Sequence, residues 1–525
     1  MPSNGRKPNI VFVVLDTHRW DRLGCYGYSR DTSPNLDAFA EQATLFENAI
    51  APAQWTIPSH ASMFTGEPPS VHRALQSDDV LNSQFKTLAE HLREQGYRTV
   101  GFCNNPLVGI LDNDLRRGFD AFYNYGGAFP AGPEDALADG FLTGMWHLAG
   151  RSLRKIAQPI QNAFARSDTL FQGALDPFWV PIWTWVANFK GNTPRSIKDV
   201  TRYIERRVNG RRGGPQFLFV NLMETHLPYT PPRSYVETFA PTYVEGEEGR
   251  DFVQDFNRRA ADWFTPPVEP FSELEKQALG EMYDAEVAYQ DHLLAQLLEA
   301  VDGSEKRDNT MVVLVGDHGE MLGEHRLMGH AFGVYEELIH VPLLIRLPGQ
   351  SRRKRIVQPV SATRLFQTTL DAAGVKTYED ISGEQVAVEE TSLRALSEGG
   401  DDQDASVVSE AYAPTFAVQV MERRKQALID ELQCRVTHRA AYEGEHKLIS
   451  VEGAQERLFC LTADPLELNH LDGADDTVLL DRMREELRSF LEKARVRTPA
   501  VEGGRAANAD NAAVQQRLRD LGYLE

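Results

Sequence analysis

The chain has 525 residues, of which 42% are hydrophobic and 25% charged, a composition typical of a soluble globular protein with a substantial core. Acidic residues outnumber basic residues by 76 to 55, so the formal net charge is −21, which argues against nucleic acid as a partner. An anionic substrate would have to be held by local cations, either metal ions or clustered basic side chains. Nothing in the sequence indicates an oligomeric state.

Cysteine usage and the N-terminus bear on the cellular compartment. The four cysteines, Cys25, Cys103, Cys434 and Cys460, lie far apart and form no CxxC pair, so neither a zinc knuckle nor a disulfide framework is indicated. The apolar run at residues 10–15 is too short for a signal peptide or a membrane span. These features predict a cytoplasmic protein without a transmembrane segment.

Short apolar runs alternate with helical patterns through about the first 370 residues. The predicted strands are residues 10–15, 99–103, 217–223, 311–315 and 341–346. The predicted helices are residues 34–49, 87–95, 273–301 and 362–374. This alternation predicts an α/β fold with a large, doubly wound, mostly parallel sheet flanked by helices.

Other stretches depart from this pattern. Residues 126–195 form an aromatic-rich insertion, and two interpretations stay open: a lid over the site, or a surface that contacts a membrane or partner through residues 139–190. Residues 235–270 have the composition of a loop. Beyond residue 375 we expect an acidic linker at 376–404, a smaller α/β subdomain at 405–495, and a tail with a short helix at 496–525.

Polar residues whose side chains could act in catalysis or metal binding follow the predicted strands or begin helices. They occur in the segments LDTHRWD, WTIPSHASMFTG, METHLPY and GDHGEMLGEH, and they are Asp16, Thr56, His226, Asp317, His318 and His330. Taken singly, each has an ordinary explanation as a helix cap or turn residue. A doubly wound sheet, however, gathers its ligands at the carboxyl ends of its strands, so together these residues predict one site.

The order of these motifs resembles the sulfatase branch of the alkaline phosphatase superfamily over residues 8–472. The matching segments include PNIVFVVLD, TSPNLDAFAEQATLFENA, TIPSHASMFTG, HLPY, DHGEMLGEH and YEELIHVPLLIRLPG. The resemblance implies a metal-dependent ester hydrolase whose catalytic domain spans residues 1–375. Asp16, Asp317 and His318 match metal-ligand positions in that family, and Thr56 matches the nucleophile.

The sequence departs from the sulfatase pattern at the nucleophile. Sulfatases have C-x-P-S-R or S-x-P-S-R there, with the first residue oxidised to formylglycine, whereas this chain has Thr56 to His60 as TIPSH. Threonine cannot form the aldehyde, and a threonine sulfate lacks the second hydroxyl through which a hydrated aldehyde expels sulfate. Thr17 also stands where a second carboxylate or amide is expected.

These departures resemble lipoteichoic acid synthases and phosphoethanolamine transferases. Those enzymes have a threonine nucleophile and an Asp-His metal pair, with later histidines at the positions of His226 and His330. They are anchored by transmembrane helices, which this sequence lacks, so their lipid-linked substrates do not carry over.

We therefore expect Asp16, Thr56, Asp317 and His318 to surround one divalent cation. Oxygen and imidazole ligands favour Mn²⁺ or Zn²⁺, while Ca²⁺ and Mg²⁺ stay open. His226 and His330 are predicted to be catalytic and to bind the transferred group, and His60 is predicted to contact a small anionic ester substrate.

Three functions remain as alternatives. The leading one is phosphate mono- or diester cleavage, or phosphoryl transfer, through a phosphothreonine at Thr56. The second is a sulfuric ester hydrolase that works without formylglycine. The third is a catalytically inactive binding homologue, which the retained set of metal-ligating and histidine residues argues against.

Overall fold

The computed structural model describes residues 6–127, 189–209, 214–399, 407–454, 456–471 and 477–498. Its main sheet consists of β1 (Asn9–Leu15), β2 (Thr44–Ile50), β3 (Arg98–Cys103), β4 (Ala121–Asn124), β5 (Gln216–Leu222), β6 (Thr310–Gly316), β9 (His340–Arg346), β10 (Lys354–Ile356) and β11 (Val360–Ser361). The strand order is β10-β2-β9-β6-β1-β5-β3-β4, with β11 beside β2. Only β9 runs antiparallel to its neighbours among these described strands, which confirms the predicted mostly parallel sheet.

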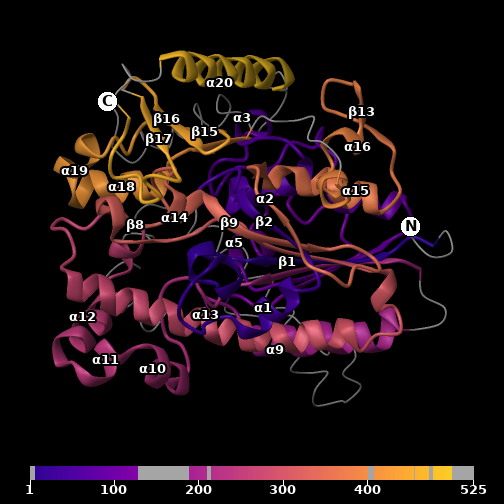
Figure 1. The fold of residues 1–525 in the computed structure, drawn as a ribbon, viewed down its shortest axis with the longest axis horizontal. Coiled ribbons are helices and arrows are strands. Elements are labelled where there is room, and N and C mark those ends of the chain that lie inside the picture. The colour runs from indigo at the N-terminus through magenta and orange to yellow at the C-terminus, as the bar shows by residue number, and fades with distance from the viewer. Residues whose placement is uncertain are drawn as a thin grey trace, which may run out of the picture.

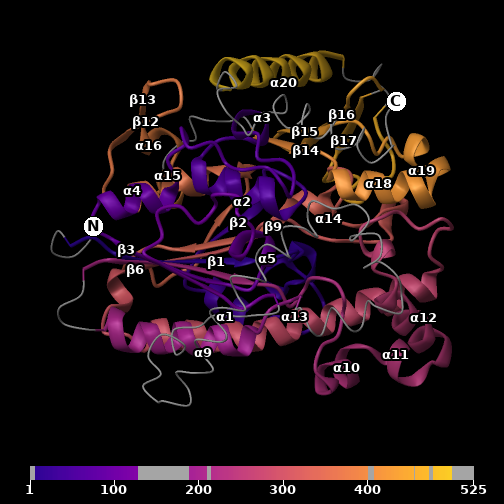
Figure 2. The same cartoon turned by 180° about the vertical axis from the view of Figure 1, so that it is seen from behind.

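Helices cover both faces of this sheet (Figures 1 and 2). One face carries α1 (Pro34–Ala40), α9 (Thr193–Tyr203) and α13 (Glu273–Asp302), and the other carries α2 (Thr56–Thr65), α4 (Leu88–Glu94) and α15 (Leu365–Ala372). Along β1, Val11 and Val13 enter the first core while Phe12 and Val14 enter the second. Burial on both faces explains why the strand is apolar throughout rather than alternating with polar residues.

The long helix α13 follows from its sequence signals. The Ser272 hydroxyl accepts a hydrogen bond from the backbone N–H of Glu275, and the Glu275 carboxylate accepts one from the backbone N–H of Ser272. This capping box satisfies two donors that the first helical turn leaves free. The helix predicted at residues 273–301 is therefore confirmed, with its end one residue later at Asp302.

Two predicted elements are wrong. The helix predicted at 34–49 ends at Ala40, and residues 44–50 form β2, where Leu45 and Phe46 enter opposite cores. Pairing with β9 and β10 outweighs the helical spacing of these residues. The loop predicted at 235–270 contains α10 (Arg233–Phe239), α11 (Pro241–Glu245) and α12 (Glu247–Arg258), and α12 buries Val253 and Phe256 in the core that α13 shares.

The acidic linker predicted at 376–404 is replaced by secondary structure over its described part. This part contains β12 (Thr377–Glu379), β13 (Gln385–Ala387), α16 (Val388–Thr391) and α17 (Leu393–Ser397). The segment is acidic overall, but a few of its apolar residues are buried in the core next to α15: Tyr378, Val388, Leu393 and Leu396. That burial holds the segment against the main domain.

A smaller unit follows near the C-terminus (orange and yellow in Figure 1). Its antiparallel sheet has β14 (Val407–Ala411), β15 (His438–Glu443), β16 (His446–Val451) and β17 (Arg457–Cys460) in that order, with α18 (Thr415–Arg424), α19 (Gln426–Glu431) and α20 (Thr477–Arg497) around it. The smaller C-terminal α/β unit expected from the sequence is thus present. Most of the predicted insertion, residues 128–188, and the tail from residue 499 lie outside the described residues.

Five further short α-helices and strands are α3 (Pro69–His72), α5 (Pro106–Gly109), β7 (Met321–Leu322), β8 (Met328–Gly329) and α14 (Glu336–Ile339). Within the described ranges, no helix has both the length and the apolar character needed to cross a bilayer.

Candidate metal-dependent active site

Three elements bring the predicted metal-ligating residues together at one edge of the main sheet. Asp16 follows β1, Asp317 and His318 follow β6, and Thr56 is the first residue of α2. Ligand atoms of Asp16, Asp317 and His318 all lie within 4.8 Å of one another, and the three side chains are fully buried. The neighbouring parallel strands β1 and β6 end at the same edge, which accounts for this convergence.

Asp16 is held by two asparagines, one on the adjacent strand β5 and one at the start of α5 after β3. Its Oδ2 accepts hydrogen bonds from Nδ2 of Asn105, at 2.6 Å, and from Nδ2 of Asn221, at 3.2 Å. Its other oxygen, Oδ1, is buried and accepts no hydrogen bond from any described residue. A buried carboxylate oxygen without a donor is a candidate metal ligand.

Asp317 has the same division between its two oxygens. Oδ1 accepts the backbone N–H groups of Thr17, at 3.2 Å, and of His318, at 3.0 Å. Oδ2 is buried without a hydrogen-bond donor in the described part of the chain. Thr17 aims its N–H at Asp317 because its backbone is left-handed, with φ of 56°, and its hydroxyl donates to the Asp16 carbonyl. The Thr17 side chain thus supplies no ligand.

His318 presents a lone pair to this cluster. Its Nδ1 lies 2.9 Å from the Gly319 carbonyl oxygen, which can only accept, so Nδ1 carries the proton and Nε2 is left unprotonated. Nε2 lies 3.5 Å from Oδ2 of Asp317 and 3.4 Å from Oγ1 of Thr56. Burial, together with the nearby His330, holds the pKa of His318 well below its usual range, so the ring is neutral and able to ligate.

Thr56 occupies the first turn of a buried helix. The preceding Trp55 is extended, the helix then runs to Thr65, and Pro58 falls in the turn where a missing N–H costs nothing. The first-turn N–H groups of Thr56 and Ile57 have no intrahelical acceptor, and the helix dipole is positive at this end. The hydroxyl of Thr56 therefore lies where negative charge on a transferred group is stabilised.

The charges of the cluster fit a divalent cation. Burial raises the pKa of Asp16, while burial and the adjacent Asp16 raise the pKa of Asp317 well above its usual range. Two such carboxyl groups ionise together only when a cation offsets their repulsion. Asp16 Oδ1, Asp317 Oδ2 and His318 Nε2 form a mixed oxygen and nitrogen donor set that suits a divalent cation.

Two half-buried histidines stand beside the buried cluster. The ring centroid of His330 lies 4.6 Å from that of His318 and 5.0 Å from that of His226. Nδ1 of His330 lies 2.7 Å from Oε1 of Glu320, and this carboxylate raises the pKa of His330 against the lowering effect of burial. Nδ1 of His226 lies 2.8 Å from the Leu227 carbonyl, and burial lowers its pKa to about 3. His226 is therefore neutral, and His330 is the better proton donor.

The family is decided by comparison with known proteins. Residues 8–375 match the family model described as Sulfatase. The chain belongs to the sulfatase family. It is 24% identical over 382 residues to the uncharacterized sulfatase YidJ of Escherichia coli, covering 73% of this chain and 71% of that protein. It is 25% identical over 392 residues to an arylsulfatase of Clostridium perfringens, covering 72% of this chain and 77% of that protein.

The fold of this sulfatase-family chain also matches solved structures. The crystal structure of a phosphonate monoester hydrolase of Agrobacterium radiobacter superposes with a TM-score of 0.63 and 20% sequence identity, covering 93% of this chain and 96% of that one. At this identity the match establishes a shared fold. Family membership and fold together identify the chain as a metal-dependent ester hydrolase of the alkaline phosphatase superfamily.

One predicted substrate contact in the sulfatase-family site has a different position. His60 is completely buried, with its ring between Phe64 and Phe219, and its Nδ1 donates to the Thr56 carbonyl at 3.0 Å. The same nitrogen lies 3.5 Å from Oδ2 of Asp317. The hydrogen bond to the Thr56 carbonyl favours a role in holding the first turn of α2 over the substrate contact predicted from the sequence.

Three site residues were missed by sequence reasoning: Asn105, Asn221 and Glu320. Asn221 is a lone polar residue in the buried run FLFVNLM, a signal that could have identified it. Asn105 follows β3 and caps α5, an ordinary structural role that conceals its contact with Asp16. Glu320 lies inside the DHGE motif, but only the fold brings it to His330.

Proposed function

We propose that this sulfatase-family enzyme cleaves phosphate mono- or diesters through a covalent phosphothreonine at Thr56. The observation that carries the proposal is the position of the Thr56 hydroxyl. It lies at the N-terminus of α2, 3.4 Å from Nε2 of His318 and 3.4 Å from Nδ2 of Asn105, beside two carboxylates that need a cation. A divalent cation held by Asp16, Asp317 and His318 would lower the pKa of this hydroxyl.

The residues of the chain have complementary tasks in this reaction. Thr56 first releases its hydroxyl proton to solvent, Oγ1 then attacks phosphorus as the alkoxide that a bound cation would stabilise, and the bond between phosphorus and the leaving oxygen breaks. His330, oriented by Glu320, gives its proton to that oxygen. Neutral His226, whose Nδ1–H donates to the Leu227 carbonyl, can accept a hydrogen bond at Nε2 from a hydroxyl or other donor of the substrate. His60 donates from Nδ1 to the Thr56 carbonyl and holds the first turn of α2 in place.

Water then completes the cycle. It attacks the phosphothreonine and gives a proton to the now neutral His330. The bond between phosphorus and Oγ1 breaks, phosphate is released, and Oγ1 returns to the alkoxide form in which the cycle began. An acceptor alcohol in place of water would make the same site a phosphoryl transferase. Because phosphorus accepts in-line attack, no second hydroxyl on the nucleophile is needed.

A sulfuric ester hydrolase is the second candidate, and the sulfatase names of the relatives favour it. The chemistry of Thr56 speaks against it, since a threonine sulfate has no geminal hydroxyl through which to expel sulfate. The phosphonate monoester hydrolase that shares the fold supports the view that this scaffold also accommodates phosphorus esters.

The deciding experiment is parallel turnover of an aryl phosphate monoester, an aryl phosphodiester and an aryl sulfate, each with Mn²⁺, Zn²⁺, Mg²⁺ or Ca²⁺. The proposal expects at least one phosphate ester to be turned over faster than the sulfate, with Mn²⁺ or Zn²⁺ as the better metal. Substantial sulfate release without phosphate-ester activity would establish the sulfatase alternative instead.

We also propose a cytoplasmic location. None of the four cysteines, all of them in described parts of the chain, forms a disulfide, which fits a reducing compartment. Localisation of a tagged full-length chain by cell fractionation tests this.

A further inference from the structure

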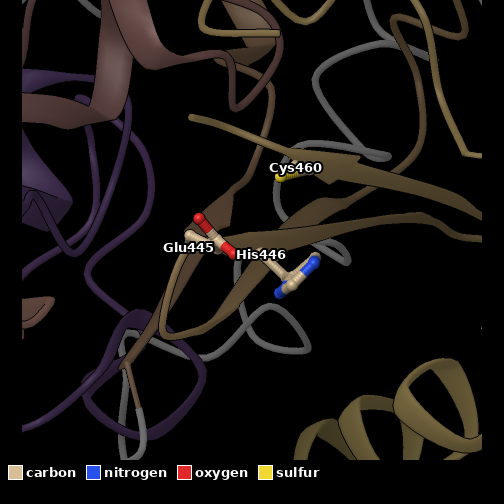
Figure 3. Close-up of side chains that lie close together, drawn as sticks. All are labelled: Glu445, His446 and Cys460. Atoms are coloured by element: carbon tan, nitrogen blue, oxygen red, sulfur yellow. The ribbon is translucent and has the colours of Figure 1, made fainter. Parts of the chain in front are cut away.

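A second group of metal-ligating side chains lies in the C-terminal sheet, outside the active site. It consists of Glu445, His446 and Cys460, and one ligand atom from each lies within 4.8 Å of the other two. Figure 3 shows the thiol on one strand and the consecutive Glu445 and His446 at the start of the neighbouring strand. This group shares no residue with the active-site cluster.

Strand pairing fixes His446 and Cys460 relative to each other. His446 begins β16, Cys460 ends β17, and the two residues are direct partners in the antiparallel pair. Partners in such a pair project to the same side of the sheet with Cβ atoms about 4.5–5.5 Å apart. The imidazole and thiol can therefore reach a common ion without a change in the backbone.

The third ligand comes from the tight turn between β15 and β16. Gly444 takes a left-handed conformation there, with φ of 58°, and places Glu445 next to His446. The Glu445 carbonyl accepts the backbone N–H of Leu461, at 2.8 Å, so the turn is tied to the end of β17. The backbone thus brings all three ligand positions to one corner of the sheet.

The side chain of Thr462 contacts two of the proposed ligands, Glu445 and Cys460. The hydroxyl of Thr462 donates to Oε2 of Glu445, at 2.6 Å, and lies 3.3 Å from Sγ of Cys460. Metal ligands are commonly held by such outer hydrogen bonds, which orient them before the ion arrives. The Thr462 contacts leave Oε1 of Glu445 for direct ligation.

A competing cluster of His325, Glu337 and Glu467 is a weaker candidate. The ammonium of the buried Lys447 lies 2.8 Å from Oε1 of Glu467, so a cation of the chain already offsets negative charge there. No lysine or arginine is recorded in an ion pair with Glu445 among the described residues. Of these two clusters, the one at Glu445 is where no lysine or arginine of the described ranges offsets the negative charge of the ligands, so a bound cation would do so.

We propose that Glu445, His446 and Cys460 bind a zinc ion at this corner of the C-terminal sheet. One sulfur, one nitrogen and one oxygen ligand suit the borderline-soft Zn²⁺, whereas Ca²⁺ and Mg²⁺ prefer oxygen alone. A water molecule completes the tetrahedron, because His446 and Cys460 are only half-buried and Glu445 is exposed. The ion joins the β15–β16 turn to the edge strand β17 and stabilises this unit.

The test is a titration of the purified full-length protein with Co²⁺, which replaces Zn²⁺ and gives a thiolate charge-transfer band in the near ultraviolet. The active-site cluster contains no sulfur, so its metal content does not contribute to the band. We expect added Co²⁺ to produce a saturable band in the wild type, and Zn²⁺ to displace it. Thr462→Val should weaken binding by about 10–100-fold, as loss of an outer hydrogen bond does at other metal sites.

Cys460→Ser should abolish the band while leaving ester turnover and the circular dichroism spectrum unchanged. Cys25→Ser is the matched control, because Cys25 is the other half-buried cysteine, and this variant should keep the band. Absence of the band in the wild type, or an equal band in Cys460→Ser, would overturn the proposal.

Discussion

Oγ1 of Thr56 lies 3.4 Å from Nε2 of His318, although 262 residues separate the two in the chain. The contact joins the first turn of α2 to the loop after β6, the two elements that also bring His60 to Asp317. The proposed function gives this hydroxyl two roles, metal ligand and nucleophile, and the predictions below test them.

Thr56→Ser should keep measurable activity, since the hydroxyl survives, whereas Thr56→Ala should lose turnover by several orders of magnitude. The Thr56→Ala protein should still fold, because the change removes one methyl and one hydroxyl group at the start of a helix. Initial rates with an aryl phosphate, compared at equal metal content, measure the difference. Equal losses in both variants would show that the hydroxyl is not the feature that matters.

Asn105→Ala should weaken metal binding, because it removes the 2.6 Å hydrogen bond that orients the Asp16 carboxylate. Loss of such an outer contact typically costs 10–100-fold in metal affinity or activity. Titration of the metal-stripped enzyme with Mn²⁺, followed by activity, measures the effect. Asn104→Ala is the matched control, since the Asn104 side chain donates to Thr193 and Ser196 and makes no recorded hydrogen bond to the cluster.

His330→Asn should slow the cleavage of alkyl phosphates more than that of nitrophenyl phosphates. A general acid contributes about 10²–10⁴-fold when the leaving oxygen is basic, and little when it leaves readily as an anion. Glu320→Gln should show the same leaving-group pattern to a smaller degree, because Glu320 only orients His330. A uniform loss across leaving groups would reject the proton-donor role.

Glu286 should make the protein less stable as the pH rises. This fully buried carboxyl group receives hydrogen bonds from Lys190 and the Thr230 N–H, but burial still raises its pKa to about 7. Because the folded-state pKa is the higher one, the contribution of Glu286 to the free energy of unfolding is fully present below the unfolded-state pKa. It is lost as the pH rises through 7. The shift from 4.5 to about 7 corresponds to roughly 3 kcal/mol in the free energy of unfolding.

Glu286→Gln should therefore lose less stability than the wild type between pH 5 and pH 8 (assay values chosen to be about 2 units below and about 1 unit above that pKa). Urea unfolding at the two pH values provides the measurement. The same pH dependence in both proteins would show that Glu286 does not titrate in this range.

Local patterns were sufficient to predict five strands of the main sheet and the convergence of Asp16, Asp317 and His318 at one of its edges. The buried strands are short apolar runs, and Asp16 and Asp317 follow two of them directly. Elements whose identity depends on distant partners were missed: residues 44–50 become β2 only through pairing with β9 and β10. For the same reason Asn105 and Glu320 were not predicted, because their roles arise from contacts with Asp16 and His330 across the fold.

The position of His60 shows a further limit of motif reasoning. Its place in the TIPSH segment suggested a substrate contact, but a side chain four residues into α2 points back along the helix to the Thr56 carbonyl. The sequence alone does not reveal that Phe219 of β5 packs edge to face against that ring.

The most direct test of the account is mass spectrometry of the wild-type enzyme, quenched in acid during turnover of an aryl phosphate. The account predicts a phosphate group on Thr56, absent without substrate and absent in Thr56→Ala. An unmodified Thr56 in the quenched wild type, together with near wild-type turnover by Thr56→Ala, would show that water attacks phosphorus directly and would contradict the phosphothreonine mechanism.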